Sequence, residues 1–373
     1  MRYSDFSELF KDKSKMPGQQ AQKFNRLIIE GLAANGACVH VISGTPVTAQ
    51  NYSSKFFPGK KCFDSKVCYD YLPAVTIPVV KNLLQLLLAF FKVLFSRNVD
   101  AVLCDVLNAS VSYGASLAAK LRRLRFVGIV TDVPWIMYEQ AKPGYLNTVR
   151  KILENCSHYI FLTQQMDQLL NPKGKPYLVI EAICDKSLEN SRRCPRQEKL
   201  CMYAGTLAIK YGIKNLVEAF LLANVPGAEL HIYGSGEYAG ELSSLAGEHG
   251  NIVYHGNVLN RQVVQAELEA NLLINPRPSG EEFTKYSFPS KNMEYMASGT
   301  PVLTTDLPGI PAEYKDKCFL IEDESVEGIA GTLKELLSLD SSVLDDMGNV
   351  AREFVLREKN QVRQAEKILA MLK

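Results

Sequence analysis

The sequence predicts an α/β protein built from two doubly wound, parallel-sheet domains. Apolar runs of strand length alternate with amphipathic helical stretches along the whole chain, which is typical of parallel sheets covered by helices. The alternation stops at a polar segment, DKSLENSRRCPRQEK (185–199), and then restarts. The 373 residues also suit two cores of ordinary size better than one. We therefore expect one domain over residues 1–186, a second over 187–355, and a helical tail over 356–373.

The first half shows five strand-like runs but lacks the one that should come first. A doubly wound domain normally opens with a buried strand, yet the segment before Gly18 contains no apolar run of strand length. We therefore expect the first strand of this domain to be missing. Strands are predicted at 38–43, 101–104, 126–130, 158–162 and 177–180, and helices at 19–35, 80–96, 109–124 and 147–155.

The second half repeats the alternation of strand-like and helical stretches more regularly. Its last part, from residue 325 onward, has a helical pattern throughout. Strands are predicted at 200–204, 229–233, 252–255, 272–275, 301–304 and 318–321, and helices at 213–222, 238–248, 261–270 and 290–297.

Composition narrows the class of protein. A hydrophobic content of 47% and a charged content of 22% exclude disordered and collagen-like chains. Residues 1–186 carry 23 Lys/Arg against 14 Asp/Glu, whereas the remainder carries 19 against 26. The basic half either faces an anionic partner or reflects unrelated surface charges. Scattered aromatic residues and the lack of a recognition module argue against nucleic-acid binding.

The cysteines and the N-terminus predict a reduced, cytoplasmic protein. None of the nine cysteines forms a C-x-x-C pair, and no histidine lies at zinc-ligand spacing from them, so we expect no metal. The start, MRYSDFSELFKDKSK, is too polar for a secretory signal. We expect no membrane-spanning helix, because no run reaches the ~18 apolar residues that one needs.

One apolar stretch leaves membrane contact open. The run LLQLLLAFFKVLF (83–95) is predicted as a helix buried against the sheet, and docking on a bilayer is the alternative. Arg122, Arg123 and Arg125 form a basic cluster that suits anionic lipid or a lipid pyrophosphate acceptor, or simply a solvated helix end. If this helix docks on a bilayer, or if the arginine cluster binds anionic lipid, the protein would lie peripherally on the inner face of the cell membrane.

The most informative stretch is LLINPRPSGEEFTKYSFPSKNMEYMASGTPVLTTDLPGIPAEY (272–314). A buried strand ends in a proline-rich loop, and a helix begins at about Ser290. Unpaired backbone N–H groups at a helix start suit a diphosphate. The Lys291 side chain adds a positive charge, and Glu294, one turn later, can accept hydrogen bonds from two vicinal hydroxyls such as those of a ribose. The pattern predicts a nucleoside diphosphate site.

This stretch resembles the donor-binding segment of the retaining glycosyltransferases of family 4, which have the GT-B fold. Glu294 matches the family's second glutamate, which binds the ribose. The family's first glutamate is replaced by Tyr286, so its role on the sugar hydroxyls passes to Glu282 on a longer loop. The resemblance implies that backbone amides hold the sugar and diphosphate at Ser287, Phe288, Pro289, Ser290 and Lys291.

Two more loops of the second half are similar to that family. The run YAGTLAIKYG (203–212) resembles the opening of its second domain, which makes Gly205 a donor-binding residue and Lys210 a cation for the leaving diphosphate. The alternative for Lys210 is a solvated surface lysine. HIYGSG (231–236) resembles the strand and G-x-G loop at the nucleotide, with Gly234 and Gly236. It is not the full G-x-G-x-x-G fingerprint, which argues against a dinucleotide oxidoreductase.

The first domain carries two weaker similarities. Gly18 and Gln19 lie in a segment like the glycine-rich loop that faces the donor in the family. Asp132 follows a buried strand where the family commonly has a His-Asp pair, and it would orient or deprotonate the acceptor hydroxyl. The alternative is that Asp132 only caps a turn.

The resemblance implies two domains facing a cleft, C-terminal helices that cross back to the first domain, and sugar transfer with retention. The expected partners are a nucleotide-sugar donor, which the resemblance implies is a UDP-sugar, and a lipid-linked or oligosaccharide acceptor of bacterial surface polysaccharide or glycolipid synthesis. No cofactor is implied. Two other functions stay open: a nucleotide-sugar 2-epimerase, which needs no acceptor, and a non-catalytic accessory or binding subunit.

Overall fold

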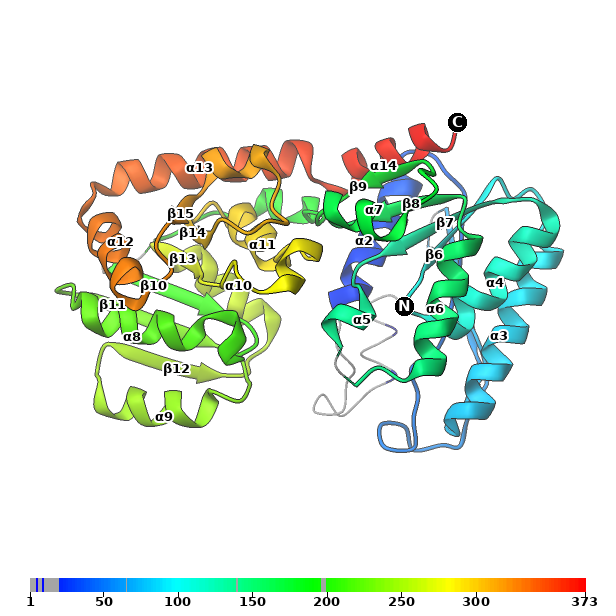
Figure 1. Ribbon diagram of the computed structural model, residues 1–373, viewed down its shortest axis with the longest axis horizontal. Helices are drawn as coiled ribbons and strands as arrows, with labels where there is room; N and C mark the ends of the chain where they lie inside the picture. The colour runs from blue at the N-terminus through cyan, green and yellow to red at the C-terminus, as the bar shows by residue number, and fades with distance from the viewer. Residues whose placement is uncertain (1–4, 6–8, 10–19, 65, 139, 196–198) are drawn as a thin grey trace. The chain divides into compact units, whose positions relative to one another are not determined.

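The chain folds into two compact α/β units (Figure 1). The computed structural model describes residues 5, 9, 20–64, 66–138, 140–195 and 199–373. Unit 1 comprises the described residues of Met1–Ile183 together with Gln361–Lys373, and unit 2 comprises those of Cys184–Asn360. The chain therefore leaves unit 1 once and returns to it at its end.

Unit 2 is built on a six-stranded parallel sheet in the order β12-β11-β10-β13-β14-β15. The first strand of the unit, β10, lies in the middle, and its neighbours β11 and β13 lead the chain in opposite directions. Such a switch point opens a crevice at the carboxyl ends of the strands, where ligands bind in doubly wound folds. The strands are β10 (Lys199–Ala204), β11 (Ala228–Tyr233), β12 (Ile252–Gly256), β13 (Leu272–Asn275), β14 (Val302–Thr305) and β15 (Phe319–Ile321).

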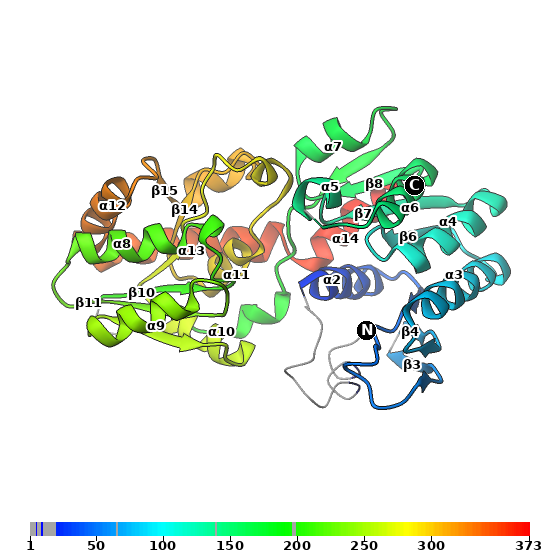
Figure 2. The same cartoon turned by 60° about the horizontal axis from the view of Figure 1, so that its bottom comes forward.

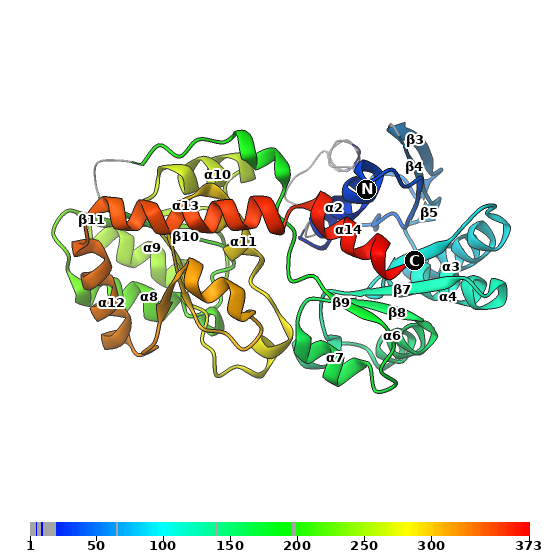
Figure 3. The same cartoon turned by 90° about the horizontal axis from the view of Figure 1, so that it is seen from above.

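Helices cover both faces of this sheet because its strands are apolar on both sides. On one face, the buried side chains of α8, α9 and α12 pack on the strands in one core, and α10, α11 and α13 belong to the other layer (Figure 3). The helices are α8 (Ile213–Ala223), α9 (Ala239–Glu248), α10 (Asn260–Glu269), α11 (Ser290–Ser298), α12 (Val326–Ser338) and α13 (Ser341–Glu358), with 3₁₀ turns η2 (Lys186–Asn190), η3 (Ile209–Tyr211), η4 (Glu282–Tyr286) and η5 (Ala312–Lys317).

The polar segment predicted as a linker is held firmly by unit 2. The Arg352 guanidinium, on α13, donates to the carbonyl oxygens of Leu188 and Ser191 at 2.9 and 2.8 Å. Arg193 forms an ion pair with Asp345 on the same helix. The proline and the charged residues of this segment predicted a free linker. Its backbone carbonyl groups instead accept hydrogen bonds from a side chain of α13.

Unit 1 contains a parallel four-stranded sheet, β6-β7-β8-β9, and a three-stranded sheet, β1-β4-β3. Among the described residues, β1 and β6 do not pair with each other. The missing first strand was predicted for the segment before Gly18, almost all of which lies outside the described residues. The strands are β1 (Val39–Ser43), β2 (Phe56–Phe57), β3 (Lys60–Asp64), β4 (Val67–Tyr71), β5 (Ala74–Val75), β6 (Ala101–Asp105), β7 (Arg125–Val130), β8 (His158–Phe161) and β9 (Tyr177–Val179).

The sequence did not indicate strands β2 to β5. β3 pairs with β4 in the antiparallel direction, and β2 with β5, so this region departs from a purely parallel sheet. β2 and β5 have two residues each, and all but one residue of β3 is exposed. β4 is mostly buried, but Asp70 interrupts its apolar run, so none of the four has the continuous apolar run that marks the parallel strands.

One face of the unit 1 sheet is covered by α2 (Gln20–Ala34) and α14 (Gln361–Met371), which lie side by side in Figures 2 and 3. Leu27 and Ile368 share one core with Ile129 and Ile160 of the sheet. The two helices approach closely because α2 has Gly31 at the contact, where a Cβ atom would lie 2.1 Å from the Gln361 carbonyl oxygen. The final helix thus belongs to unit 1.

The remaining helices of unit 1 include the apolar stretch at residues 83–95. It forms α3, whose outer side is exposed from Ile77 to Phe95, so the prediction of a buried helix was wrong. By length and composition alone, α3 is also long and apolar enough to cross a membrane, contrary to our expectation. These helices are α3 (Pro78–Phe95), α4 (Ala109–Arg122), α5 (Pro134–Met137), α6 (Pro143–Asn155) and α7 (Gln164–Leu170).

Candidate functional site

The start of α11 is fixed at the switch point of the unit 2 sheet by buried polar contacts. The Tyr295 hydroxyl accepts a hydrogen bond from the Ala204 backbone N–H at 2.8 Å, which ties α11 to the end of β10. The Asn292 side chain accepts from the Asn275 amide at 2.8 Å and donates to the Thr304 hydroxyl at 3.1 Å, at the ends of β13 and β14. These contacts aim the positive end of the helix dipole at the crevice.

The N-cap residue of this helix provides no side-chain capping bond. Pro289 is the N-cap residue, and Ser290 is the first helical residue with an exposed side chain, so Ser290 does not serve as a cap. Phe288 is buried and packs on the Tyr314 ring at 5.1 Å, so only its backbone is available to a ligand. A helix start without a cap leaves N–H groups for an anion.

Lys291 places a half-buried cation directly at this helix start. Its Nζ lies 3.3 Å from the Tyr203 hydroxyl and 4.4 Å from the centre of the Tyr203 ring. A Cβ atom on Gly205 would lie 1.2 Å from this Nζ, so only glycine leaves room for the ammonium group. Burial, followed by repulsion from Arg277, lowers the pKa of Lys291 to about 7.

Arg277, which sequence reasoning missed, provides a second cation. Its guanidinium lies 4.7 Å from the centre of the Tyr211 ring and donates to the Ser287 hydroxyl at 3.4 Å. Burial lowers its pKa below the ordinary value, and its Nε atom is buried with no hydrogen-bond partner among the residues that the structure describes. A cation between two prolines was the available signal in the sequence, but only the fold brings it to Lys291.

Neither cation is neutralised by an adjacent carboxylate. Within the described part of the chain, no ion pair includes Lys291 or Arg277, although Glu294 and Glu267 raise the Lys291 pKa at longer range. Buried charges are costly unless they are paired. Two such cations beside an uncapped helix start form a site suited to an anion with more than one charge, such as a diphosphate.

Two glycine loops are joined tightly beside these cations. The Gly205 and Leu207 N–H groups donate to the carbonyls of Tyr233 and Ser235 at 2.8 and 2.9 Å. A Cβ atom on Gly234 would lie 1.7 Å from the Gly205 carbonyl oxygen, and one on Gly236 would lie 2.4 Å from that of Leu207. These glycines therefore allow the two loops to pack backbone to backbone, which brings three of the predicted positions together.

Of the other predicted donor residues, Glu294 is half-buried, whereas Lys210 and Glu282 are exposed. Glu294 is close enough to Lys291 to raise the pKa of that lysine. Lys210 is exposed, and its Nζ lies 5.7 and 5.8 Å from the Tyr211 and Phe283 ring centres, on the aromatic pair that Arg277 also contacts. Glu282 is exposed on η4 and has no hydrogen bond or ion pair with these cations among the described residues.

Unit 1 has a separate polar cluster around Asp132, at the carboxyl ends of β6 and β7. The Tyr138 hydroxyl donates to Asp132 Oδ2 at 2.9 Å, and Asn25 Nδ2 donates to Asp105 Oδ2 at 3.0 Å. Burial raises the pKa of Asp132, and the Asp105 charge adds to this effect, whereas the Tyr138 hydrogen bond opposes it. Burial also raises the pKa of Asp105.

Two polar atoms of this cluster make no hydrogen bond with the described residues. The Thr131 Oγ1 and Asn25 Oδ1 atoms are buried and have no hydrogen-bond partner among the described residues. Buried polar groups without partners are uncommon unless a ligand or water meets them. Sequence reasoning found Asp132 but missed Asp105 and Asn25, which reach it only through the fold. Gly18 and Gln19 lie outside the described residues.

Comparison with known proteins agrees with this geometry. Residues 186–354 match the family model "Glycosyl transferases group 1". No curated protein matched the chain. Among solved structures, sucrose-phosphate synthase from Thermosynechococcus elongatus is 17% identical with a TM-score of 0.70, over 96% of this chain and 94% of that one.

Two further solved structures contain nucleotide ligands. An E. coli trehalose-6-phosphate protein bound with UDP-2-fluoro glucose is 11% identical with a TM-score of 0.67, over 94% of this chain and 95% of that one. HepE of Anabaena in complex with UDP is 17% identical with a TM-score of 0.60, over 82% and 85%. At these identities the likeness establishes the fold. The chain has the GT-B fold, and its residues 186–354 are similar to the glycosyl transferases group 1 family model.

Proposed function

We propose that the protein is a family 4 glycosyltransferase that moves a sugar, with retention, from a UDP-sugar to a hydroxyl acceptor. The observation that carries this proposal is the pair of half-buried cations, Lys291 and Arg277, beside the start of α11, where the N-cap residue Pro289 makes no side-chain capping bond. Both lie within the residues that match the group 1 family model. UDP is chosen because HepE and the E. coli protein are described with UDP or a UDP-sugar.

The chain's own groups can perform the main electrostatic task of this reaction. When the glycosyl bond breaks, negative charge develops on the leaving diphosphate. Hydrogen-bond donors and cations that are already held where this charge develops lower the barrier to the reaction, because they need no reorganisation during the step. We assign this task to the Lys291 ammonium, the Arg277 guanidinium and the α11 backbone N–H groups, with Lys210 at the exposed side. Glu294 would hold the ribose, and Glu282, which lies on a longer loop than in the family, would contact the sugar.

Asp132 is assigned to the acceptor. Its raised pKa keeps it closer to neutral pH than an exposed aspartate, which suits a group that accepts a proton from a hydroxyl. We propose a lipid-linked or oligosaccharide acceptor in bacterial surface polysaccharide or glycolipid synthesis, on the cytoplasmic side. The basic excess of residues 1–186 supports an anionic acceptor of this kind.

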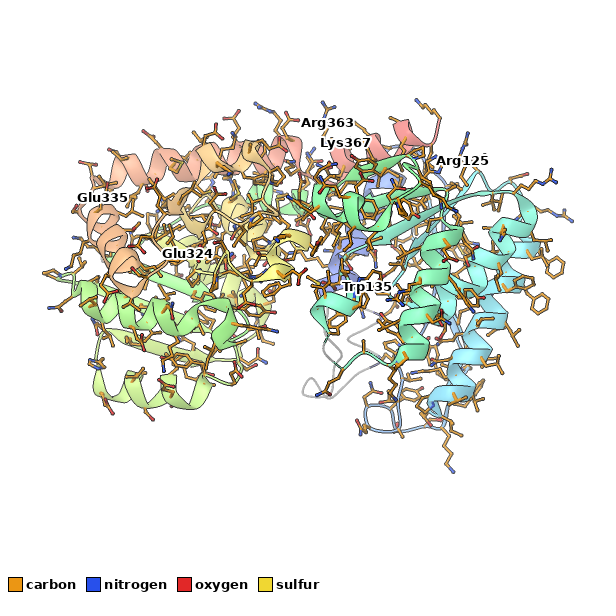
Figure 4. All side chains as sticks on the ribbon, viewed as in Figure 1. Arg125, Trp135, Glu324, Glu335, Arg363 and Lys367 are labelled. Carbon is orange, nitrogen blue, oxygen red and sulfur yellow. The ribbon has the colours of Figure 1, made fainter. Side chains whose placement is uncertain are left out.

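Calorimetric titration with UDP, GDP and ADP tests the donor site. We expect UDP to bind, and Glu294→Ala to weaken its binding by roughly 1–3 kcal/mol, as expected when a charged hydrogen-bond partner is lost. The matched control is Glu335→Ala, an exposed glutamate on α12 that Figure 4 labels, which should leave the affinity unchanged.

The outcomes separate the alternatives. If none of the three nucleotides binds to the folded protein, the donor site is refuted. UDP binding with no transfer to any hydroxyl acceptor would assign an accessory or binding subunit. Turnover of the nucleotide sugar without an acceptor would assign a 2-epimerase.

A further inference from the structure

The outer side of α3 exposes a continuous row of large apolar side chains. Phe91 and Phe95 stack with their ring centres 6.1 Å apart on this side. Leu83, Leu87, Phe91 and Phe95 recur every fourth residue, so they lie along one face of the helix. We call this row the α3 face. It comprises Ile77, Val79, Val80, Leu83, Leu87, Phe91 and Phe95, which are 44–78% exposed.

The opposite side of α3 is fully used in packing within unit 1. Gln85, Ala89 and Val93 are buried there. The contact with α4 is close because α4 has Gly114, where a Cβ atom would lie 2.1 Å from the Leu86 carbonyl oxygen. Figures 1 and 2 show α4 between α3 and α6, with α3 at the margin of the unit. The α3 face therefore belongs to a helix that is anchored in the fold, and it points away from it.

Single exposed apolar residues are ordinary, but a row of this size is not. An 18-residue helix is roughly 27 Å long. Contiguous apolar patches of several hundred Å² on soluble proteins mark sites that contact another surface. A second observation is needed to identify that surface.

The charged residues near the α3 face indicate that the surface it contacts is anionic. The sequence contains no Asp or Glu between Ala74 and Val99, nor between Val106 and Thr131, so neither α3 nor α4 carries an acidic residue. The Arg122 guanidinium donates to the Val93 carbonyl at 2.7 Å, so both helices end at the same side of the unit. At that end, the exposed cations are Arg97, Lys120, Arg123 and Arg125, of which Figure 4 labels Arg125.

We infer that unit 1 binds an anionic phospholipid bilayer through the α3 face, with α3 lying in the plane of the interface. Apolar side chains enter the boundary between headgroups and acyl chains, and the four cations contact the lipid phosphates. Spanning is disfavoured because α3 would have to leave α4, which contacts it along its buried side. Docking would bring the enzyme to a membrane-bound acceptor, but the inference itself does not depend on the proposed function.

Flotation of the full chain with vesicles tests the inference. We compare phosphatidylcholine vesicles with vesicles that also contain about 30% phosphatidylglycerol, which gives them an anionic surface. The variant Leu87→Gln/Phe91→Gln/Phe95→Gln should lose at least tenfold in binding to the anionic vesicles. The control, Leu222→Gln/Val343→Gln/Val350→Gln, changes side chains on unit 2 that are 48–50% exposed and should bind like the unchanged protein.

A second variant tests the charges without changing the apolar row. Arg97→Gln/Arg123→Gln/Arg125→Gln should lower binding to anionic vesicles about fivefold for each cation removed and should make it less sensitive to salt. Thermal unfolding and UDP titration confirm that each variant is folded.

Three results would overturn the inference. The unchanged protein could fail to float with either vesicle type. The α3 variant could float as well as the unchanged protein. The protein could instead form a dimer that the α3 variant abolishes, with no vesicle binding, which would assign the α3 face to a second copy of the chain.

Discussion

Replacing Lys291 with methionine is expected to weaken UDP binding roughly a hundredfold, the equivalent of about 3 kcal/mol for a charge-assisted hydrogen bond in a buried site. Methionine keeps the apolar stem and removes only the charge, which lies beside Gly205 and Tyr203 where a diphosphate would bind. Calorimetric titration with UDP measures the effect. Lys334→Met, on an exposed part of α12, is the matched control and should bind UDP normally.

The same substitution should stabilise the nucleotide-free protein. The folded-state pKa of Lys291, about 7, is below the ordinary lysine value of 10.5, so the folded state binds this proton less readily than the unfolded state. The charge therefore opposes folding most strongly below pH 7, and its cost disappears as the pH rises towards 10.5. At pH 6 we expect the unfolding temperature of Lys291→Met to rise by about 2–4 °C for each kcal/mol recovered. Lower stability together with normal UDP affinity would show that Lys291 is only a structural residue.

Replacing Asp132 with asparagine is expected to lower kcat by about 10²–10⁴-fold, the range for loss of a general base. Asparagine preserves the size of the side chain and can still contact the Tyr138 hydroxyl, but it cannot take a proton from the acceptor. UDP affinity should not change because the donor residues belong to unit 2. The measurement is a steady-state transfer assay with UDP-sugar, accompanied by UDP titration.

The control for Asp132 is Asp100→Asn, which changes an exposed aspartate of the same unit. The kcat of that variant should equal the kcat of the unchanged protein. If Asp132→Asn also retains full kcat while the protein transfers sugar, Asp132 is not the base, and its hydrogen bond with Tyr138 is only structural.

Much of the donor site could be predicted from sequence because its residues are local in the chain. The helix start at Ser290, Lys291 and Glu294 lie within one turn or two of each other, so their proximity follows from helix geometry alone. The glycines at 205 and 234 follow two neighbouring parallel strands, whose carboxyl ends meet at one edge. Local pattern and strand order were enough to bring these positions together.

Residues that meet only through tertiary packing could not be predicted in this way. Arg277 is an ordinary loop cation until the fold places it against Tyr211 and beside Lys291. Asn25 reaches Asp105 across 80 positions of the sequence. The apolar pattern of α3 predicted a helix, but it gave no indication of which side α4 would cover.

The pH dependence of UDP-glucose binding tests the central claim, that the half-buried Lys291 ammonium group holds the donor diphosphate. A bound diphosphate stabilises the protonated lysine, and the free protein loses this proton above a pKa of about 7. UDP-glucose has no terminal phosphate that titrates near neutral pH. We therefore predict that calorimetric affinity falls roughly tenfold or more from pH 6.5 to pH 8.5, and that Lys291→Met binds weakly with no such fall. Equal affinities at the two pH values, or the same fall in Lys291→Met, would contradict the assignment.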